Sequence, residues 1–291
     1  MSKQIAVISF SVILTLGYLV FAINSKVSNK NVTVLLTGDI MLGRSVMTKS
    51  LSSGDATYPF RKVANKLREA DIVFSNLENP IVSGCSKTDE GYKFCADPKM
   101  VDGLVFAGID IVNLANNHTL NYGKEGLEET KKVLVENQIM WVGDENLEII
   151  EKEGTKIGFL GFDFVTKEPT EKDYQFVKNS DEKVDVLIVG VHWGKEYSDK
   201  ATILQNKIAA KLIENGADVI AGHHPHWVQN IEYLNGKPIY YSLGNFIFDQ
   251  AWSEETKKGL VIKLTYRGSR LETEERLPVY MRSFAQLEWS N

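Results

Sequence analysis

The stretch Ala217-Asp-Val-Ile-Ala-Gly-His-His-Pro-His-Trp-Val-Gln229 carries three of the five histidines of this chain. Its apolar start, ended by a glycine, is typical of a buried strand of an α/β sheet, and His223, His224 and His226 then fall in the loop at the carboxyl end, where such sheets bind ligands. Pro225 stiffens the loop and biases His224 toward an extended conformation. Neutral imidazole is a common metal ligand, so the loop predicts a metal site, with capping or core histidines as the alternative.

Every other candidate ligand also comes at the end of a predicted strand. His118 follows the apolar residues 109–114, and His192 follows residues 184–191. Carboxylate and amide side chains take the same place elsewhere: Asp39 after residues 32–36, Glu78 after residues 72–75, and Asn117 beside His118. Because the carboxyl ends of parallel strands meet at one edge, we expect these side chains to gather along one rim of the sheet.

The net charge argues against a nucleic-acid partner. All 38 acidic residues but only 30 of the 33 basic residues lie beyond residue 30, so that part of the chain carries a net charge of −8. A nucleic-acid surface needs a basic patch that displaces counterions. The length of 291 residues is enough for one large α/β domain or two small ones.

The amino-terminal region predicts a membrane anchor. Residues 5–23 contain no charged side chain and are long enough to cross a bilayer as a helix. Lys3 precedes this run and Lys26 and Lys30 follow it, so charge alone does not decide the orientation. A cleaved secretory signal is the alternative, but no small-x-small cleavage site follows. We expect residues 1–30 to be a cytoplasmic stub, anchor and linker of a single-pass cell-membrane protein, and residues 31–291 to be one extracytoplasmic domain.

Cys85 and Cys95 lie ten positions apart in a polar segment that has no neighbouring histidine or third cysteine. In an exported protein this spacing predicts a local disulfide, whose loop closure would contribute about 2–3 kcal/mol of stability. Two independent thiols are the alternative.

The alternation of apolar and helical patterns predicts an α/β fold with a layered α/β/β/α sandwich. Central parallel strands are expected at residues 32–36, 72–75, 109–114, 184–192 and 219–222, and helices at residues 58–69, 97–106, 124–137 and 202–215. Residues 139–142, 147–151 and 156–162 are interpreted as a meander. Residues 168–183 are interpreted as a loop, with a short helix as the alternative. The later strands at 228–234, 238–242, 260–266 and 271–280 are expected to form a second sheet, and Asn235-Gly236 marks a hairpin.

Six ordered motifs between residues 32 and 250 resemble the bacterial capsule-synthesis protein CapA family, which is associated with poly-γ-glutamate and is a branch of the calcineurin-like metallophosphoesterase superfamily. The motifs are Thr37-Gly-Asp-Ile-Met41, Asn76-Leu-Glu78, Asn116-Asn-His118, His192-Trp-Gly-Lys-Glu196, Gly222-His-His-Pro-His226 and Tyr241-Ser-Leu-Gly-Asn-Phe246. The resemblance implies a four-layered sandwich, a membrane-attached extracytoplasmic location and a divalent-metal centre.

By this resemblance the centre holds one or two divalent ions, which could be Mn, Zn, Fe or Mg. The implied ligands are Asp39, the bridging acid Glu78, Asn117, His192, His224 and His226. Two departures stand out. Met41 places a thioether where the superfamily has an imidazole, and thioethers suit soft metals rather than the ions of hydrolases. The bridging acid is a glutamate in place of an aspartate.

Further residues are candidates for the chemistry around such a centre. His118, next to Asn117 but not itself an implied ligand, could protonate a leaving oxygen or stabilise its charge. Arg44 could bind a phosphate oxygen, with an exposed charge as the alternative. His223, Glu196 and Asn245 could support the ligands from behind, with no role, a surface acid and a turn amide as the respective alternatives.

Two functions follow from the sequence. One is a metal-dependent, phosphoesterase-like hydrolase that acts outside the membrane on a phosphoester or an anionic polymer. The other is a non-catalytic accessory of polymer synthesis or export, which works with other membrane components of a synthesis complex. Met41 favours the accessory, whereas His118 favours the hydrolase.

Overall fold

The computed structural model describes residues 30–88, 90–143 and 145–290, and in these residues the strands form two sheets. The first sheet has the order β14-β13-β12-β1-β2-β3-β4, and β11 also pairs with β1. Its strands are β1 (Val32–Ile40), β2 (Ile72–Leu77), β3 (Ile111–Asn113), β4 (Met140–Val142), β11 (Asn245–Ile247), β12 (Lys258–Arg267), β13 (Arg270–Ser283) and β14 (Gln286–Trp289). The second has the order β5-β6-β7-β8-β10-β9, with β5 (Glu148–Lys152), β6 (Thr155–Asp163), β7 (Val186–His192), β8 (Val219–His223), β9 (Ile231–Leu234) and β10 (Lys237–Tyr240).

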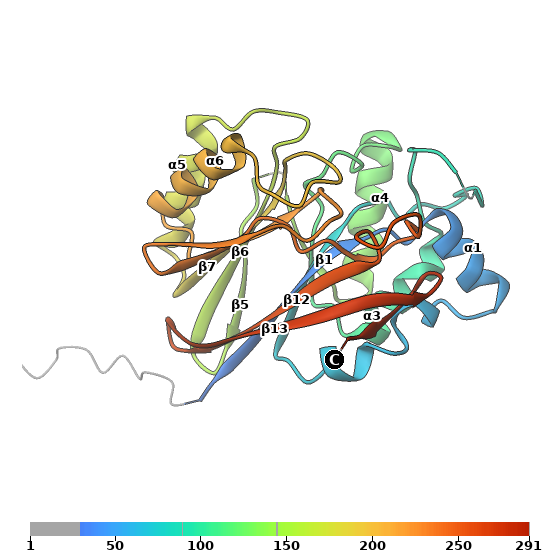
Figure 1. The fold of residues 1–291 in the computed structure, drawn as a ribbon, viewed down its shortest axis with the longest axis horizontal. Coiled ribbons are helices and arrows are strands. Elements are labelled where there is room, and N and C mark those ends of the chain that lie inside the picture. Colours follow the sequence, from blue (N-terminus) through green and yellow to red (C-terminus); the bar gives the residue numbers. More distant parts are fainter. Residues whose placement is uncertain (1–29, 89, 144, 291) are drawn as a thin grey trace, which may run out of the picture.

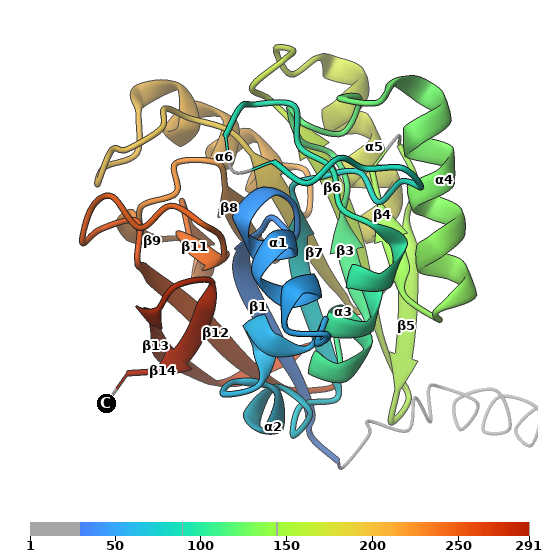
Figure 2. The same cartoon turned by 90° about the vertical axis from the view of Figure 1, so that its right-hand side faces the viewer.

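Helices lie outside both sheets, as Figures 1 and 2 show. One side carries α1 (Arg44–Ser52), α2 (Ala64–Leu67), α3 (Val101–Ala107) and α4 (Gly123–Glu136), and the other carries α5 (Glu171–Asp181) and α6 (Ile203–Glu214). Alternate residues of β1 explain the layers: Leu35 packs toward the first group of helices, whereas Val34 and Leu36 pack between the sheets. The predicted two-sheet α/β sandwich is therefore present.

The membership of the sheets differs from the sequence prediction. The predicted meander holds only in part. Its last two strands pair as the β5–β6 hairpin of the second sheet, but β4 pairs in parallel with β3 in the first sheet. The late strands divide between the two sheets. β9 and β10 join the second sheet beside β8, whereas β12 extends the first sheet antiparallel to β1, and β13 pairs antiparallel with β12. The hairpin predicted at Asn235-Gly236 is confirmed, since it joins β9 to β10. Long-range pairing of this kind leaves no local trace in the sequence.

Two helix predictions also needed correction. In residues 168–183 the loop interpretation is wrong and the helix alternative is confirmed, because they contain the 11-residue helix α5. A capping box of Thr170 and Asp173 starts it, and Tyr174 and Val177 are buried on one face, although charged residues blur the pattern. The single helix predicted for residues 58–69 is instead a short 3-10 helix, Tyr58–Phe60, followed by α2.

The predicted membrane segment at residues 5–23 lies outside the described residues. Within the described ranges, none of the helices combines the length and the apolar character needed to cross a bilayer.

The registers of the parallel strands bring the candidate residues to one rim. Asp39 on β1 is paired with Asn76 on β2 and with Asn245 on β11. In the second sheet, His192 at the end of β7 is paired with His223 at the end of β8. The carboxyl ends of the central strands of both sheets thus lie side by side, and the loops that follow these strands meet at the same rim.

Candidate metal centre

Two overlapping groups of acidic and histidine side chains meet at this rim. Glu78, His192 and His224 form one group, and Asp39, Glu78 and His226 form the other; within each group one ligand atom per residue lies within 4.8 Å of the others. All five residues are buried. Each group could hold a metal ion, and Glu78 belongs to both.

The histidine loop is more tightly turned than the sequence predicted. His224 has φ +95° and His226 has φ +58°, so His224 is left-handed and not extended. Contacts with distant segments hold this conformation: the His224 N–H donates to Asp39 Oδ2 at 3.2 Å, and the Tyr197 N–H donates to the Pro225 carbonyl at 2.8 Å. Such backbone conformations persist where the surroundings enforce them, and here they turn two imidazoles toward the acids.

Asn245 fixes the tautomer of His226. Both hydrogens of its amide are used, because Nδ2 donates to the Thr256 carbonyl at 2.9 Å and to Gln250 Oε1 at 3.1 Å. Its Oδ1 therefore accepts from His226 Nδ1 at 3.0 Å. Nε2, 3.7 Å from Glu78 Oε1, is therefore the nitrogen that can lose its proton and bind an ion.

Asn76 links the two groups, and the sequence analysis gave it no role. Its Nδ2 donates to Asp39 Oδ1 at 2.8 Å and lies 3.3 Å from His192 Nδ1. Its Oδ1 accepts from Asn113 Nδ2 at 3.2 Å, which sets the orientation of the amide. The signal in the sequence was its place two residues before Glu78 at the end of a strand.

Asn117 and His118 approach the centre from the loop after β3. Asn117 Oδ1 lies 2.9 Å from His192 Nε2, so Asn117 joins the group of Glu78, His192 and His224. His118 Nε2 lies 3.7 Å from Glu78 Oε1, while its Nδ1 lies 3.0 Å from Asn121 Nδ2. Both residues are thus at the position that the sequence predicted for them.

Unpartnered buried atoms test whether these residues fit a metal ion. Both carboxylate oxygens of Glu78 and the Nδ1 atom of His224 are buried without a hydrogen-bond partner among the described residues. A buried acid without a donor is costly, and a divalent cation supplies the missing partner. Carboxylate, amide and imidazole donors also suit the borderline and hard divalent ions. The residues therefore fit a divalent metal ion.

The pKa values show how the metal-free cluster distributes its protons. Burial raises the pKa of Glu78 well above its ordinary value. Burial opposes the charged form of His226, but Glu78 and Asp39 outweigh it and raise the pKa of His226 to about 9. Burial and the neighbouring charge of His226 lower the pKa values of His224 and His118 to about 4. Both imidazoles are therefore neutral at pH 7, and the neutral ring of His224 is the form that binds a metal.

Met41 does not face the centre as a ligand. It is fully buried in the apolar cluster between the first sheet and its helices, and its sulfur accepts a hydrogen bond from the Gly43 N–H at 3.1 Å. The group of Asp39, Glu78 and His226 consequently has three protein ligands, whereas the group extended by Asn117 has four.

The Arg44 side chain is largely buried, and its guanidinium is already paired with a carboxylate, so it is not available to bind a phosphate through two nitrogens. Its guanidinium holds Asp249 with two hydrogen bonds, one of them from Nε to Oδ2 at 3.1 Å, and the two side chains are 13% and 5% exposed. The exposed-charge alternative is wrong. A contact between Arg44 and phosphate stays a prediction, and it would require Arg44 to leave Asp249.

His223 and Glu196 lie at the edge of the centre. His223 turns away from the ligands and places Nε2 3.0 Å from the Thr37 carbonyl. Glu196 is half-buried, and its negative charge raises the pKa values of Glu78 and His226. His223 thus contacts the backbone of β1, whereas Glu196 acts on the centre through its charge.

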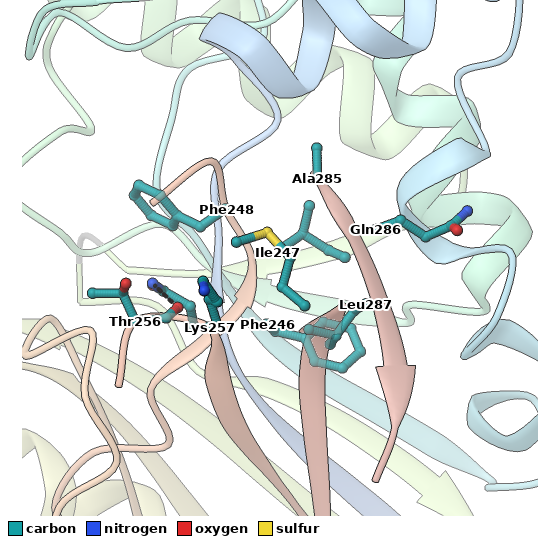
Figure 3. Close-up of a pocket in the computed structure, with 10 residues that line it drawn as sticks. Phe246, Ile247, Phe248, Thr256, Lys257, Ala285, Gln286 and Leu287 are labelled. Atoms are coloured by element: carbon teal, nitrogen blue, oxygen red, sulfur yellow. Dashed lines mark hydrogen bonds between the residues drawn. The ribbon is translucent and has the colours of Figure 1, made fainter. Parts of the chain in front are cut away.

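A cavity of about 370 Å³ opens beside Asn117. Its polar lining includes Asp163 at the end of β6 and Thr166 and Lys167 from the loop that follows. The pocket behind β11, which Figure 3 shows, has a volume of only about 10 Å³ and can hold at most one water. Of these two pockets, the cavity beside Asn117 is the one that is large enough for a substrate group.

The structure joins Cys85 and Cys95 in the disulfide that the sequence predicted, with their Cα atoms 5.9 Å apart. The bond closes the loop between β2 and α3, and Phe94 next to Cys95 stacks on His118. The loop thus reaches the centre.

Comparisons with known proteins agree with the sequence motifs. The family model described as bacterial capsule synthesis protein PGA_cap matches residues 33–250. The chain is 33% identical to the capsule biosynthesis protein CapA of Bacillus anthracis, over 80% of this chain and 64% of that protein. It is 31% identical to the PGA biosynthesis protein CapA of Bacillus subtilis, over 77% of this chain and 65% of that protein.

The chain therefore spans just under two thirds of the length of these relatives. Among solved structures, a putative 5'-nucleotidase from Staphylococcus aureus, in complex with alpha-ketoglutarate, shares the fold with a TM-score of 0.52 and 15% identity, over 87% of this chain and 55% of that one. The match to the family model, over most of the described residues, and the two relatives lead to one conclusion: this chain belongs to the bacterial capsule synthesis protein (PGA_cap) family.

Proposed function

We propose that this protein is a divalent-metal-dependent hydrolase of the phosphoesterase type that acts in the synthesis of an anionic capsular polymer. The observation that carries the proposal is the pair of ligand groups that share Glu78, whose buried oxygens have no partner among the described residues. The names of the Bacillus relatives support the biological setting, capsule and PGA biosynthesis.

Each residue of the centre has a distinct task in this proposal. Glu78, His192, His224 and Asn117 would hold one ion, and Asp39, Glu78 and His226 a second. Divalent ions in such sites act as Lewis acids on phosphoryl oxygens and lower the pKa of water. Asn76 holds Asp39, and Asn245 holds His226 in the tautomer that presents Nε2.

His118 would serve the leaving oxygen. Its Nε2 atom faces Glu78 from outside both ligand groups, and its ring is neutral at pH 7 because burial lowers its pKa to about 4. A phosphate dianion beside the ring would raise that pKa, since an opposite charge favours the protonated form. His118 can then donate a proton or a hydrogen bond to the oxygen that departs. The cavity beside Asn117 would take the organic part of the substrate.

The test uses the full-length protein, purified and loaded separately with Mn, Zn, Fe and Mg. We expect one or two ions per chain by elemental analysis, and hydrolysis of phosphomonoesters or phosphodiesters, or cleavage of poly-γ-glutamate. The matched control, His224→Ala with His226→Ala, should lose both metal and turnover. Loaded protein that turns over none of these substrates would overturn the hydrolase proposal.

A non-catalytic accessory role is the second candidate, and the position of Met41 favours it. Met41 lies in the core and leaves one ligand group with three protein ligands, so that ion could be weakly held. If the protein is an accessory, a His118→Gln strain should still produce polymer. If polymer synthesis requires the hydrolase activity, the same strain should produce little or none. Polymer yield in such a strain separates the two candidates.

We also propose that residues 5–23 anchor the domain on the outer side of the cell membrane, with Lys3 in the cytoplasm. The uncharged run supports this placement. Protease added to intact spheroplasts should digest the domain, and protection of the domain would contradict the proposal.

A further inference from the structure

His118 contacts a segment that the proposed chemistry does not use. The ring of Phe94 stacks on its imidazole, with ring centroids 4.0 Å apart and planes inclined by 23°. Phe94 is only 3% exposed, so water does not compete for this face of the imidazole. Stacked aromatic pairs contribute about 0.5–1.5 kcal/mol beyond their buried area, which is enough to favour one ring orientation over others.

The same segment makes polar contacts around His118. Asn121 Nδ2 donates to the Tyr92 carbonyl at 3.1 Å and lies 3.0 Å from His118 Nδ1, so one amide ties the loop to the imidazole. Arg44 Nη1 donates to the Gly91 carbonyl at 2.9 Å. These contacts come from backbone carbonyls of the loop and therefore depend on the path of its chain and not on its side chains.

Phe94 is held by the packing of its ring and by the chain that follows it. The guanidinium carbon of Arg44 lies 4.6 Å from the centroid of the ring, and the ring of Phe248 lies 6.0 Å away. The described residues between 86 and 93 are all exposed, and they offer Phe94 no packed support. Cys95, the next residue, is bonded to Cys85 across the loop. Ala96 is held by backbone bonds to Pro80 and Val82, at 2.8 and 2.9 Å.

We propose that Phe94 is a positioning residue for His118, and that the Cys85–Cys95 bond keeps Phe94 in place. Phe94 lies against the imidazole face, so it limits rotation of the ring and keeps Nε2 directed toward Glu78, from which it is 3.7 Å distant. The ring of Phe94 contacts His118, Phe248 and Arg44, and none of these is a proposed ligand of the ions, so its loss should spare metal binding. The effect on turnover rests on the proposed function, but the placement of the ring does not.

Nuclear magnetic resonance tests the placement without any need for turnover. The chain has five histidines, so the ring protons of His118 can be assigned by comparison with His118→Gln. Their signals should be shifted by the ring current of Phe94, with or without zinc, and the shift should be lost in Phe94→Leu and kept in Phe94→Tyr. Cys85→Ser with Cys95→Ser should reduce it. Phe164→Leu, which removes a buried ring stacked on Phe162 at 5.3 Å, is the control that should leave it unchanged.

A double-mutant cycle then tests the route to turnover on an alkyl phosphate. Phe94→Leu should lower turnover about tenfold in the wild-type background and cause no further loss in the His118→Gln background, because coupled residues are not additive. Metal content should be unchanged in every variant. Equal losses in both backgrounds, or His118 ring signals that do not move in Phe94→Leu, would overturn the proposal. If the wild type shows no turnover, the proposed function fails. The resonance measurement then decides by itself whether Phe94 fixes the orientation of the His118 ring.

Discussion

Replacing Glu78 by glutamine separates metal binding from folding more cleanly than any other change in this site. Glu78 is fully buried, belongs to both ligand groups, and has two oxygens without a partner among the described residues. The isosteric amide keeps the shape and removes the charge. We therefore expect Glu78→Gln to stabilise the metal-free protein and to weaken binding at both positions at once.

The magnitude follows from the burial of the carboxyl group. The gain comes from the lost charge, because the glutamine amide is buried as well. Between pH 4.5 and the raised folded-state pKa, each pH unit adds about 1.4 kcal/mol to the cost of burying the acid, and glutamine avoids this cost. The sign depends on pH. Burial raises the pKa of Glu78 above the ordinary 4.5, so its burial is tolerated below pH 4.5 and becomes costly as the pH rises toward the folded-state pKa. The advantage of glutamine should therefore be small at pH 4.5 and grow above it.

Metal should have the opposite effect on the two proteins. An ion at a hundredfold excess over its dissociation constant adds about 2.7 kcal/mol to the wild type. A gain of 1 kcal/mol raises the melting temperature of a domain of this size by about 2–4 °C, so loading should raise it by about 5–11 °C. Glu78→Gln should show little of this rise.

Thermal unfolding followed by circular dichroism, with and without metal and at pH 4.5, 6 and 8, measures both effects. Asp39→Asn is the matched control, since it alters only one of the two groups and should lose part of the rise. A full metal-dependent rise in Glu78→Gln would refute the assignment of Glu78 as the shared ligand. A metal-free variant less stable than the wild type at pH 8 would refute the reasoning about its burial.

Three further outcomes can be measured. His118→Gln should keep the metal content found by elemental analysis but lower turnover about 10²–10⁴-fold, with a larger loss on alkyl than on aryl phosphates. The metal-free protein should lose stability in denaturant titrations as the pH falls from 6.5 to 4, because the folded-state pKa values of His118 and His224 are near 4 and the unfolded chain takes up protons first. Asp249→Asn should lower the free energy of unfolding by about 3 kcal/mol, since it leaves the buried guanidinium of Arg44 without its partner; a loss below 0.5 kcal/mol would show that water replaces Asp249.

The local sequence determined which residues lie at the ends of the strands. That information was enough to predict which side chains gather at the candidate metal centre. Apolar runs followed by Asp39, Glu78, Asn117, His192 or the histidine loop could be recognised one at a time, because strand patterns and turn chemistry depend on neighbours in the chain. The loop that Cys85 and Cys95 close could be recognised for the same reason, since it spans only ten positions.

Met41 shows what a motif by itself cannot decide. In the sequence it stands in the place of a metal ligand and suggests a defective site. In the structure its sulfur accepts the N–H of Gly43 and its side chain packs in the core, so it is not an unsuccessful ligand. The direction of a side chain depends on what packs against it, and those neighbours are far away in the sequence.

Only the tertiary structure decided which distant groups support the centre. Asn245 lies beside His226 because β11 pairs with β1, two hundred residues away from it in the chain, and Asp249 reaches Arg44 through the same pairing. Phe94 meets His118 because the disulfide loop folds back over the loop after β3. The physical reason is the same in each case: a local pattern gives the type of an element and the residue at its end, whereas the partner of that residue is chosen by the packing of two sheets whose pairing is long-range.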